Sequence, residues 1–280
     1  MIPAPFEYER ATSVEDALAL LARYGEEAKL LAGGHSLLPL MKLRFARPSV
    51  LVDLGGVDEL RYVRDDGERV AVGALVTHEE VHRDPILAEA CPLLAHAAGE
   101  VGDPQVRHMG TIGGSVAHAD PAGDLPTVLV TLEADVVVRG MEGVRTTPAV
   151  EFFRGTFDPA LAQDEIVTEI RAPKTGAGGW SYVKFHPRAQ DWAIVGVAAL
   201  VQRTNGAAAR TAVGLTNMGS TPLRARAVED ALAGGADPGG AAEAASEGTS
   251  PVDDAFASAE YRRYLAPVLV RRALEEALAR

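Results

Sequence analysis

The sequence predicts an α+β protein built from two domains. Helix-like and strand-like segments alternate over the first half of the chain, glycine and proline interrupt the pattern at 173–179, and strands followed by helices fill the rest. A length of 280 residues fits two domains, because a domain has roughly 150 residues. We therefore expect an N-terminal domain over 1–173 and a smaller C-terminal α/β domain over 179–280 that combines an antiparallel sheet with helices.

The first elements are a helix and two strands. Ser13 is placed to cap a helix whose apolar residues recur on one face, and Gly25 ends it. Apolar segments at 29–32 and 50–54 follow, and both are expected to be strands. Gly33-Gly34 marks a loop directly after the first of these strands.

Short helices and a long loop are expected in the middle of the chain. Thr77 and Glu80 can form a capping box for a short helix that Asp84-Pro85 ends. The alanine-rich segment 86–98 predicts a second helix. Segment 103–126 is rich in Gly, Pro, His and Asp without a clear period, so we expect an ordered loop there.

Strand patterns dominate the remainder. Segments 135–139 and 144–147 flank a glycine turn and predict a hairpin, and 165–171 predicts a further strand. Asn205-Gly206 is a turn signal between two of the later strands. The C-terminal domain is expected to contain strands at 180–185, 193–202 and 208–217, helices at 223–233 and 258–278, and a mobile loop at 234–250.

Charge and cysteine content exclude several classes of function. Lys and Arg number 27 and Asp and Glu 39, so the net charge of −12 argues against a nucleic-acid partner. The single cysteine, Cys91, excludes a disulfide framework and any site in this chain built on several thiolates. The sequence shows no signal peptide and no apolar run of roughly 18 residues. We expect a cytoplasmic protein, with association with the inner face of the membrane left open.

A zinc-protease pattern is present but weakly supported. His78-Glu-Glu-Val-His82 fits H-E-x-x-H, in which two histidines on one helical face bind zinc. The predicted helix ends two residues after His82 and no third ligand is evident, so the simpler interpretation is a solvated helix face. We expect no metal site.

Two glycine-rich segments carry more information. Leu30-Leu-Ala-Gly-Gly-His-Ser-Leu-Leu38 runs from an apolar strand into two glycines, and Gly110-Thr-Ile-Gly-Gly-Ser115 has a similar composition. Glycine permits close backbone approach, so consecutive amides could converge on an anion such as a diphosphate. Taken singly, either segment could equally be a tight turn. Neither matches the Rossmann or P-loop fingerprint.

Together, the two loops resemble a known family. Ala32-Gly-Gly-His-Ser36 and the later segment 106–124 are similar to the FAD-binding medium subunits of the molybdenum hydroxylases, which include the carbon monoxide dehydrogenase medium subunit and the flavin domain of xanthine dehydrogenase. The resemblance covers essentially the whole chain. It implies a PCMH-type, vanillyl-alcohol-oxidase-like FAD-binding domain with subdomains of about 1–54 and 55–173, followed by the family's C-terminal domain over 179–280.

The resemblance implies roles for three side chains near the flavin. Asp124 matches a position that bonds flavin hydroxyls, Lys184 one near N1 and the C2 carbonyl of the ring, and Trp192 one against the isoalloxazine. The alternatives are a helix cap at Asp124, an exposed strand lysine at 184 and a core tryptophan at 192. Relatives often carry Asn-Arg where this chain has His108-Met109, which reduces the charge beside the second loop.

No catalytic residue is assigned to this chain, and all expected site residues bind the cofactor. The FAD-binding residues expected from the resemblance are Leu30, Leu31, Ala32, Gly33, Gly34, His35, Ser36, Leu37, Val101, Thr111, Ile112, Gly113, Gly114, Ser115, Asp124, Ile166, Val167, Lys184 and Trp192.

The function implied is that of an electron-transfer flavoprotein subunit in a multi-subunit oxidoreductase. The expected partners are a molybdopterin-containing large subunit and a small subunit with [2Fe–2S] clusters, arranged as a dimer of heterotrimers, and an external electron acceptor. The lone cysteine agrees with clusters held elsewhere. A stand-alone FAD-dependent oxidoreductase and a flavin-free assembly protein remain alternatives. The substrate, whether carbon monoxide, a purine, an aldehyde or an N-heterocycle, and the acceptor stay open.

Overall fold

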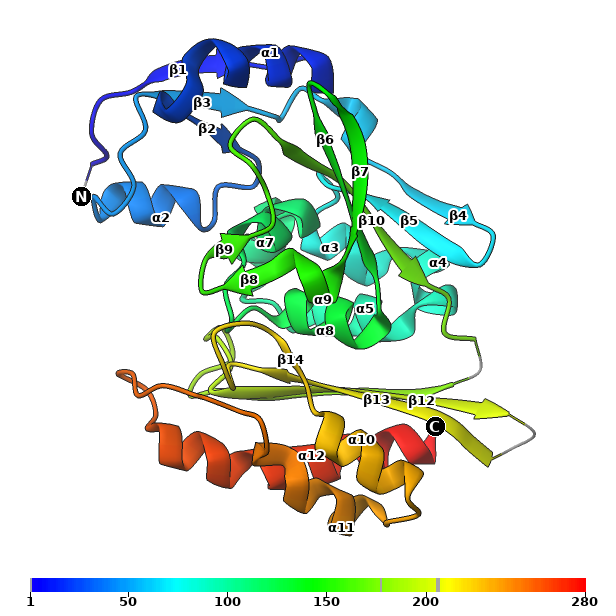
Figure 1. Cartoon of the computed structure of the whole chain (residues 1–280). Coiled ribbons are helices and arrows are strands. Elements are labelled where there is room, and N and C mark those ends of the chain that lie inside the picture. Colours follow the sequence, from blue (N-terminus) through cyan, green and yellow to red (C-terminus); the bar gives the residue numbers. More distant parts are fainter. Residues whose placement is uncertain (1, 177, 205–206) are drawn as a thin grey trace.

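Three blocks of structure follow one another along the chain in the computed structural model (Figure 1), which describes residues 2–176, 178–204 and 207–280. The first block surrounds a small parallel sheet, the second a five-stranded sheet with helices, and the third a four-stranded sheet with helices on its outer face. Each block has its own cluster of buried apolar residues. The mixed α+β class expected from the sequence is confirmed.

The first block is built on three parallel strands in the order β1-β3-β2. Ser13 accepts a hydrogen bond from the Asp16 amide and begins the first helix, and Gly25 ends it with φ of +55°, as predicted. The elements are β1 (Glu7–Arg10), α1 (Val14–Tyr24), β2 (Ala28–Leu31), α2 (Leu37–Lys42) and β3 (Val50–Asp53).

The second block contains an antiparallel sheet in the order β4-β5-β10-β6-β7, covered on one face by helices (Figure 1). The predicted hairpin is β6 with β7. Its strands are β4 (Val63–Asp66), β5 (Arg69–Gly73), β6 (Asp135–Gly140), β7 (Gly143–Pro148) and β10 (Ile166–Pro173), with β8 (Phe153–Gly155) and β9 (Asp158–Pro159) paired separately. Its helices are α3 (His78–Arg83), α4 (Pro85–Ala90), α5 (Pro92–Gly99), α6 (Pro104–Met109), α7 (Ile112–His118), α8 (Asp124–Leu132) and α9 (Ala149–Phe152).

The third block begins at Gly179, and its antiparallel sheet has the order β11-β12-β13-β14. Helix α12 covers one face of this sheet and α5 and α8 of the second block cover the other (Figure 1). The elements are β11 (Gly179–Phe185), β12 (Val195–Thr204), β13 (Ala207–Thr216), β14 (Leu223–Arg224), α10 (Arg226–Ala233), α11 (Pro238–Ala242) and α12 (Ala259–Ala279). The predicted Asn205-Gly206 turn lies outside the described residues.

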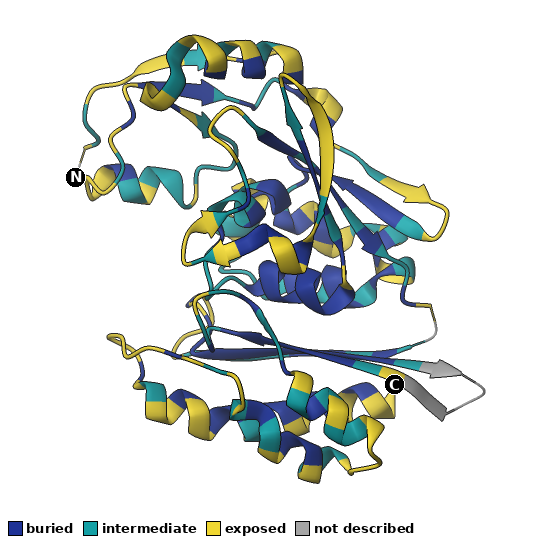
Figure 2. Ribbon diagram, in the orientation of Figure 1, coloured by how far each residue is buried: buried dark blue, intermediate teal, exposed yellow. Residues whose placement is uncertain are grey.

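Helix α8 joins the second and third blocks. All nine of its residues are buried, as Figure 2 shows, because the helix packs between its own domain and strands β12 and β13. Asp124, Thr127 and Thr131 are polar residues within it, and each makes hydrogen bonds there. The interface between the two domains is therefore a closely packed and partly polar one.

Two predictions for the middle of the chain are wrong. Segment 86–98 forms two helices, because Pro92 cannot donate a backbone hydrogen bond and starts α5 after a break at Cys91. Segment 103–126, predicted to be a loop, contains α6, α7 and the start of α8. Asp103 and Thr111 cap the first two of these helices, and the short helices hide any period in the sequence.

The region 223–250 also differs from expectation. Residues 223–224 form strand β14, so the helix starts only at Arg226. The segment predicted as a mobile loop contains α11 and a 3-10 turn over Glu243–Ser246 that packs against α12. Asp237 caps α11 by accepting from the Gly240 amide. Within the described ranges, none of the helices combines the length and apolarity that a bilayer crossing requires.

Candidate functional site

The two glycine-rich segments meet in the structure. A Cβ atom at Gly33 would lie 2.1 Å from the carbonyl oxygen of Met109 and 2.7 Å from the Cα atom of Gly110. The first glycine loop (residues 32–36) therefore touches the start of the second glycine loop (residues 110–115), where only glycine fits. The contact lies between the first two blocks, because one loop follows β2 and the other precedes α7.

The first glycine loop has unpaired backbone donors. Gly34 has φ of +74°, a conformation that favours glycine. The loop has no Lys or Arg between Leu30 and Leu40. Consecutive free N–H groups make a concave anion site without a cationic side chain. Within the described structure, no hydrogen-bond acceptor faces the amides of Gly33, Gly34, His35 and Ser36.

The second glycine loop behaves differently from the expectation that its amides converge on an anion. The Ile112 amide donates to the Val76 carbonyl at 3.0 Å and the Gly113 amide to the Ala74 carbonyl at 2.9 Å. The Gly114 amide donates to the Thr111 hydroxyl at 3.1 Å, which caps α7. The glycines here permit close packing on the segment after β5, and a Cβ at Gly113 would lie 2.5 Å from that of Ala74.

A buried polar cluster links the two domains. Lys184 on β11 donates to Asp124 on α8 at 2.9 Å and to the Glu100 carbonyl at 2.8 Å. Tyr182, two residues earlier on the same strand, donates its hydroxyl to Asp124 at 2.6 Å. The Lys184 side chain is only 2% exposed and that of Asp124 7%. Burial raises the pKa of Asp124 and that of Tyr182, and the Lys184 charge opposes the shift at Asp124.

This cluster brings together predicted residues that are distant in the sequence. Asp124 is the first residue of α8, whose N-cap is Gly123, so the alternative of a capping aspartate does not apply. Lys184 is buried, so the alternative of an exposed strand lysine does not apply either. Val101 follows Glu100 and is half-buried. Tyr182 was not predicted, although its place two residues before Lys184 on a strand puts both side chains on one face.

The other predicted residues occupy several environments. Ile166 and Val167 alternate on β10 and are 1% and 5% exposed, one in the core of the first block and one in that of the second. Both side chains are thus enclosed by protein. Trp192 is 64% exposed in the segment between β11 and β12, which removes the core alternative. Leu30, Leu31 and Leu37 flank the first glycine loop on β2 and α2 and are half-buried.

The zinc-like pattern does not form a metal centre. His82 contacts the Ala95 carbonyl through Nδ1 at 3.0 Å, and Glu79 pairs with Arg83 and Arg107. The ring of His78 is buried beside Gly110. In the part of the chain that the structure describes, no three His, Cys, Asp or Glu side chains are grouped to hold a metal ion.

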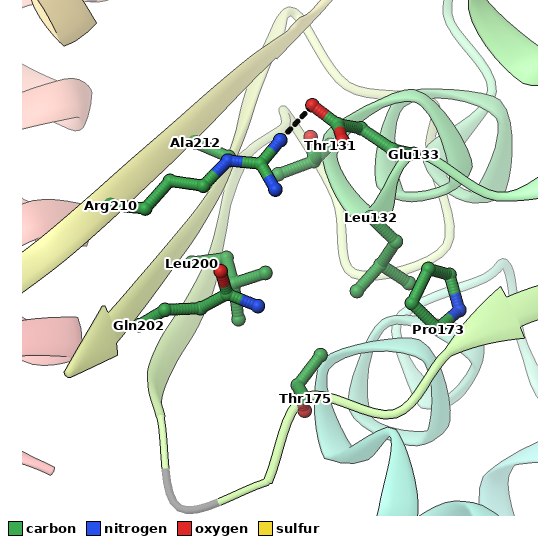
Figure 3. A pocket seen from close by; sticks show the side chains of 9 residues that line it. All are labelled: Thr131, Leu132, Glu133, Pro173, Thr175, Leu200, Gln202, Arg210 and Ala212. Atoms are coloured by element: carbon green, nitrogen blue, oxygen red, sulfur yellow. Dashed lines mark hydrogen bonds and ion pairs between the residues drawn. The ribbon is translucent and has the colours of Figure 1, made fainter. Parts of the chain in front are cut away.

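A small cleft lies at the other end of the domain interface (Figure 3). It has a volume of about 50 Å³ and includes the ion pair of Arg210 with Glu133. It shares no residue with the glycine loops or the Asp124–Lys184 cluster, and it is too small for a dinucleotide. Its lining residues are Thr131, Leu132, Glu133, Pro173, Thr175, Leu200, Gln202, Arg210 and Ala212.

Two family models match the chain. Residues 4–175 match the FAD-binding domain of molybdopterin dehydrogenases, and residues 180–277 match the CO dehydrogenase flavoprotein C-terminal domain. The chain belongs to the flavoprotein family of the molybdopterin dehydrogenases. The recognition made from the two glycine loops is therefore confirmed.

Relatives in this family align over the full chain. The carbon monoxide dehydrogenase medium chain of Hydrogenophaga pseudoflava is 41% identical, over 100% of this chain and 99% of the relative. The nicotine 6-hydroxylase medium subunit of Paenarthrobacter nicotinovorans is 38% identical over the same shares.

Solved flavoprotein structures of the family superpose closely on the chain. A carbon monoxide dehydrogenase from Hydrogenophaga pseudoflava matches with a TM-score of 0.96 and 44% identity, and quinoline 2-oxidoreductase from Pseudomonas putida 86 with 0.94 and 32%. Each match covers 100% of this chain and 99% of the other. The fold of a medium subunit is thus present from end to end, with FAD as the cofactor of the family's N-terminal domain.

Proposed function

We propose that this chain is the FAD-binding electron-transfer subunit of a molybdenum hydroxylase or dehydrogenase complex. It takes electrons from the [2Fe–2S] clusters of a small partner subunit and passes them to an external acceptor. Substrate oxidation takes place on a molybdopterin-containing large subunit, and two such heterotrimers form a dimer. The proposed location is the cytoplasm, with the complex able to associate with the inner face of the membrane.

The first glycine loop is the observation that carries this proposal. Four successive amides, from Gly33 to Ser36, lack an acceptor within the described structure, and the loop is held against the second glycine loop at Gly110. Four successive free amides in one loop offer hydrogen-bond donors that suit an anionic ligand. The diphosphate of FAD has the required charge and oxygen acceptors, so the residues present fit the cofactor.

Some of the remaining predicted residues hold the first glycine loop in place, and others are placed to contact the cofactor. The second glycine loop holds the first in place through Gly110, and the hydroxyls of Thr111 and Ser115 are the polar groups that it offers. Val101, Asp124 and Lys184 form a second contact region at the domain interface. FAD, when bound, accepts electrons singly and releases them in pairs, while the protein supplies position and electrostatics.

Lys184 is the residue that we propose to tune the flavin. Its ammonium is buried and spends two of its three N–H groups on Asp124 and the Glu100 carbonyl, which fixes the charge in place. A fixed buried cation stabilises negative charge nearby much more than an exposed one does. We therefore propose that Lys184 favours the reduced, anionic flavin. The exposed side chain of Trp192 is available to contact the isoalloxazine ring of FAD or a partner subunit.

A stand-alone FAD oxidoreductase is the second candidate. It would need its own substrate pocket beside the flavin, and neither the cleft in Figure 3 nor the larger one lined by Arg224, Arg226 and Glu247 shares a residue with the glycine loops. A flavin-free assembly protein is the third candidate, and the unpaired amides of the first glycine loop argue against it. Neither alternative explains why the chain aligns from end to end with medium subunits.

Co-expression with the neighbouring subunit genes tests the proposal. The complex should contain FAD that acid releases, together with molybdenum and iron in the partner chains. Reduction of the molybdenum subunit by its substrate should bleach the visible absorbance of the flavin. Turnover of a small organic substrate by this chain alone would favour the stand-alone candidate, and a complex without flavin would favour the assembly candidate.

A further inference from the structure

Asn217, the residue after β13, joins two segments that belong to different domains. Its backbone amide donates to the Pro121 carbonyl at 2.8 Å, and Nδ2 of its side chain donates to the Ala193 carbonyl at 2.8 Å. Pro121 belongs to the short segment between α7 and α8, whereas Ala193 directly follows Trp192 in the segment between β11 and β12. One residue therefore ties the segment before α8 to the segment that carries Trp192.

The position of Asn217 places both contacts close to the buried polar cluster at the domain interface. Thr216, the residue before it, lies in register with Gly196 of β12, and Gly196 lies in register with Lys184 of β11. The Thr216 hydroxyl also donates to the Thr127 hydroxyl on α8 at 2.8 Å. Neighbouring strands lie about 4.8 Å apart, so the backbone of Asn217 is roughly 10 Å from that of Lys184.

Asn217 adopts a backbone conformation that few side chains tolerate. Its φ of +61° lies in the left-handed region, where asparagine is favoured among the residues other than glycine. Glycine would adopt the same φ without a side chain. The specific contribution of asparagine at this position is therefore the hydrogen bond from its side chain to the Ala193 carbonyl.

The segment over 186–194 is anchored at the end where it returns to the sheet. The Ile194 amide donates to the Phe185 carbonyl at 2.8 Å and closes the segment, and Arg262 of α12 donates to the Ile194 carbonyl. The bond from Asn217 reaches the preceding carbonyl, which is directly next to Trp192. Since the Trp192 side chain is 64% exposed, its position depends strongly on how firmly this backbone is held.

We propose that Asn217 is a positioning residue for the flavin, which fixes the Trp192 segment against the segment before α8. It thereby sets the place of the Trp192 indole relative to the Lys184 ammonium. The inference rests on the proposed function, in which these two side chains meet the isoalloxazine ring of FAD. Without the Nδ2 bond the indole would have to be ordered when FAD binds, and that ordering costs conformational entropy.

The mobility of Trp192 in the full-length chain tests the anchoring and needs no FAD. The chain has two tryptophans, so ¹⁵N-tryptophan labelling gives few signals, and Trp192→Phe assigns those of residue 192. Asn217→Gly keeps the backbone conformation without the side chain, and Asn217→Asp keeps the shape without the donor. We expect the backbone order parameter of Trp192 to fall from about 0.85 to below about 0.6 in both variants. A wild-type value in either variant would overturn the inference.

FAD affinity in the complex with the partner subunits tests the step from Trp192 to the flavin. Asn217→Gly should weaken FAD binding about threefold, as the loss of one hydrogen bond predicts. In a Trp192→Ala background the same change should have no effect, because its influence passes through the indole. Equal weakening in both backgrounds, or no weakening in either, would contradict the proposed role. Should Asn217→Gly fail to fold, Asn217→Asp carries the same comparison.

Arg44→Gly is the matched control. Arg44 also has a positive φ, of +65°, and its side chain donates to one carbonyl, that of Ile2, at 3.0 Å. The control change therefore relaxes the backbone in the same way and removes one side-chain hydrogen bond, but in the first block. It should leave the Trp192 order parameter and FAD affinity unchanged, and losses equal to those of Asn217→Gly would overturn the inference. Absence of FAD from the wild-type complex would instead contradict the proposed function, and the order parameter would still decide the anchoring.

Discussion

At the scale of single residues, Gly33 is the most sensitive point of the site. Its missing side chain leaves the space into which the Met109 carbonyl fits, and a methyl group there would collide with backbone that cannot rotate away. Gly33→Ala should therefore separate the two glycine loops and weaken FAD binding about tenfold or more, since an overpacked contact costs about 1–3 kcal/mol. Fluorescence titration of FAD measures the effect.

Gly155→Ala is the matched control for that change. The nearest atoms to a Cβ at Gly155 belong to Asp158 at 3.6 Å and 3.7 Å, which are ordinary contact distances. This variant should bind FAD like the wild type. Equal weakening in both variants would show that the loss comes from general destabilisation and not from the loop contact.

Lys184→Met removes the ion pair that Lys184 makes with Asp124 and leaves the Asp124 carboxylate buried. Breaking one side of a buried pair costs about 3–5 kcal/mol, so the free energy of unfolding should fall by an amount in that range. The midpoint potential of bound FAD should also fall, because a fixed positive charge is lost. Chemical denaturation and a spectroelectrochemical titration measure the two effects.

Lys174→Met is the control for Lys184→Met. Lys174 pairs with Asp65 on the surface, where water screens the charges, so both stability and potential should change little. A normal flavin potential in Lys184→Met would contradict the tuning role while leaving the structural role of the Asp124–Lys184 pair intact.

The lowered pKa of His78 should make the free energy of unfolding depend on pH. Its pKa is lowered to about 4 in the folded chain, against about 6.5 in the unfolded chain. Above pH 6.5 this histidine leaves the free energy of unfolding unchanged. Between pH 6.5 and 4 the unfolded chain binds a proton that the folded chain does not, so the free energy of unfolding falls as the pH falls. At pH 5 the loss should be about 2 kcal/mol. Urea denaturation at pH 7.5 and 5.0 should show a smaller decrease in His78→Gln than in the wild type, and an equal decrease would contradict the pKa shift.

At the scale of elements, the contact between α8 and β13 holds the two domains together. Gly214 on β13 lies so close to α8 that a Cβ there would be 2.0 Å from the Thr131 hydroxyl and 3.0 Å from the Thr127 methyl group. Gly214→Ala should lower the free energy of unfolding by about 1–3 kcal/mol, as overpacking does. Gly234→Ala, where the nearest atoms to an added Cβ lie at 3.4 Å, should leave the free energy of unfolding almost unchanged. Thermal unfolding of both variants measures the difference.

The elements that local chemistry determines could be predicted from the sequence. Ser13 and Gly25 set the ends of α1, and the Thr77–Glu80 capping box begins α3 as expected. The short helices over 103–126 could not be predicted, because one or two turns are too few to establish a period. Their stability comes from packing: Ile112 and Val116 are fully buried against residues far away in the chain.

At the scale of the whole molecule, the family and the glycine loops could be recognised from the sequence, and the geometry between them could not. Nothing local indicates that Lys184 would meet Asp124, because β11 and α8 belong to different domains. Two amides of the second glycine loop donate to the carbonyls of Ala74 and Val76, and only the fold brings these carbonyls close to the loop. Only the tertiary structure therefore distinguishes residues that hold the glycine loops in place from residues that could contact FAD.

The proposed electron-transfer role depends on FAD binding at the first glycine loop. The most direct measurement is the amount of acid-releasable FAD per copy of this chain in the complex with its partner subunits, for the wild type and for Gly33→Ala. The expected result is one FAD per wild-type chain, bleached on addition of the substrate of the molybdenum subunit, and a large loss of FAD in the variant. A fully assembled and active wild-type complex without flavin in this chain would contradict it.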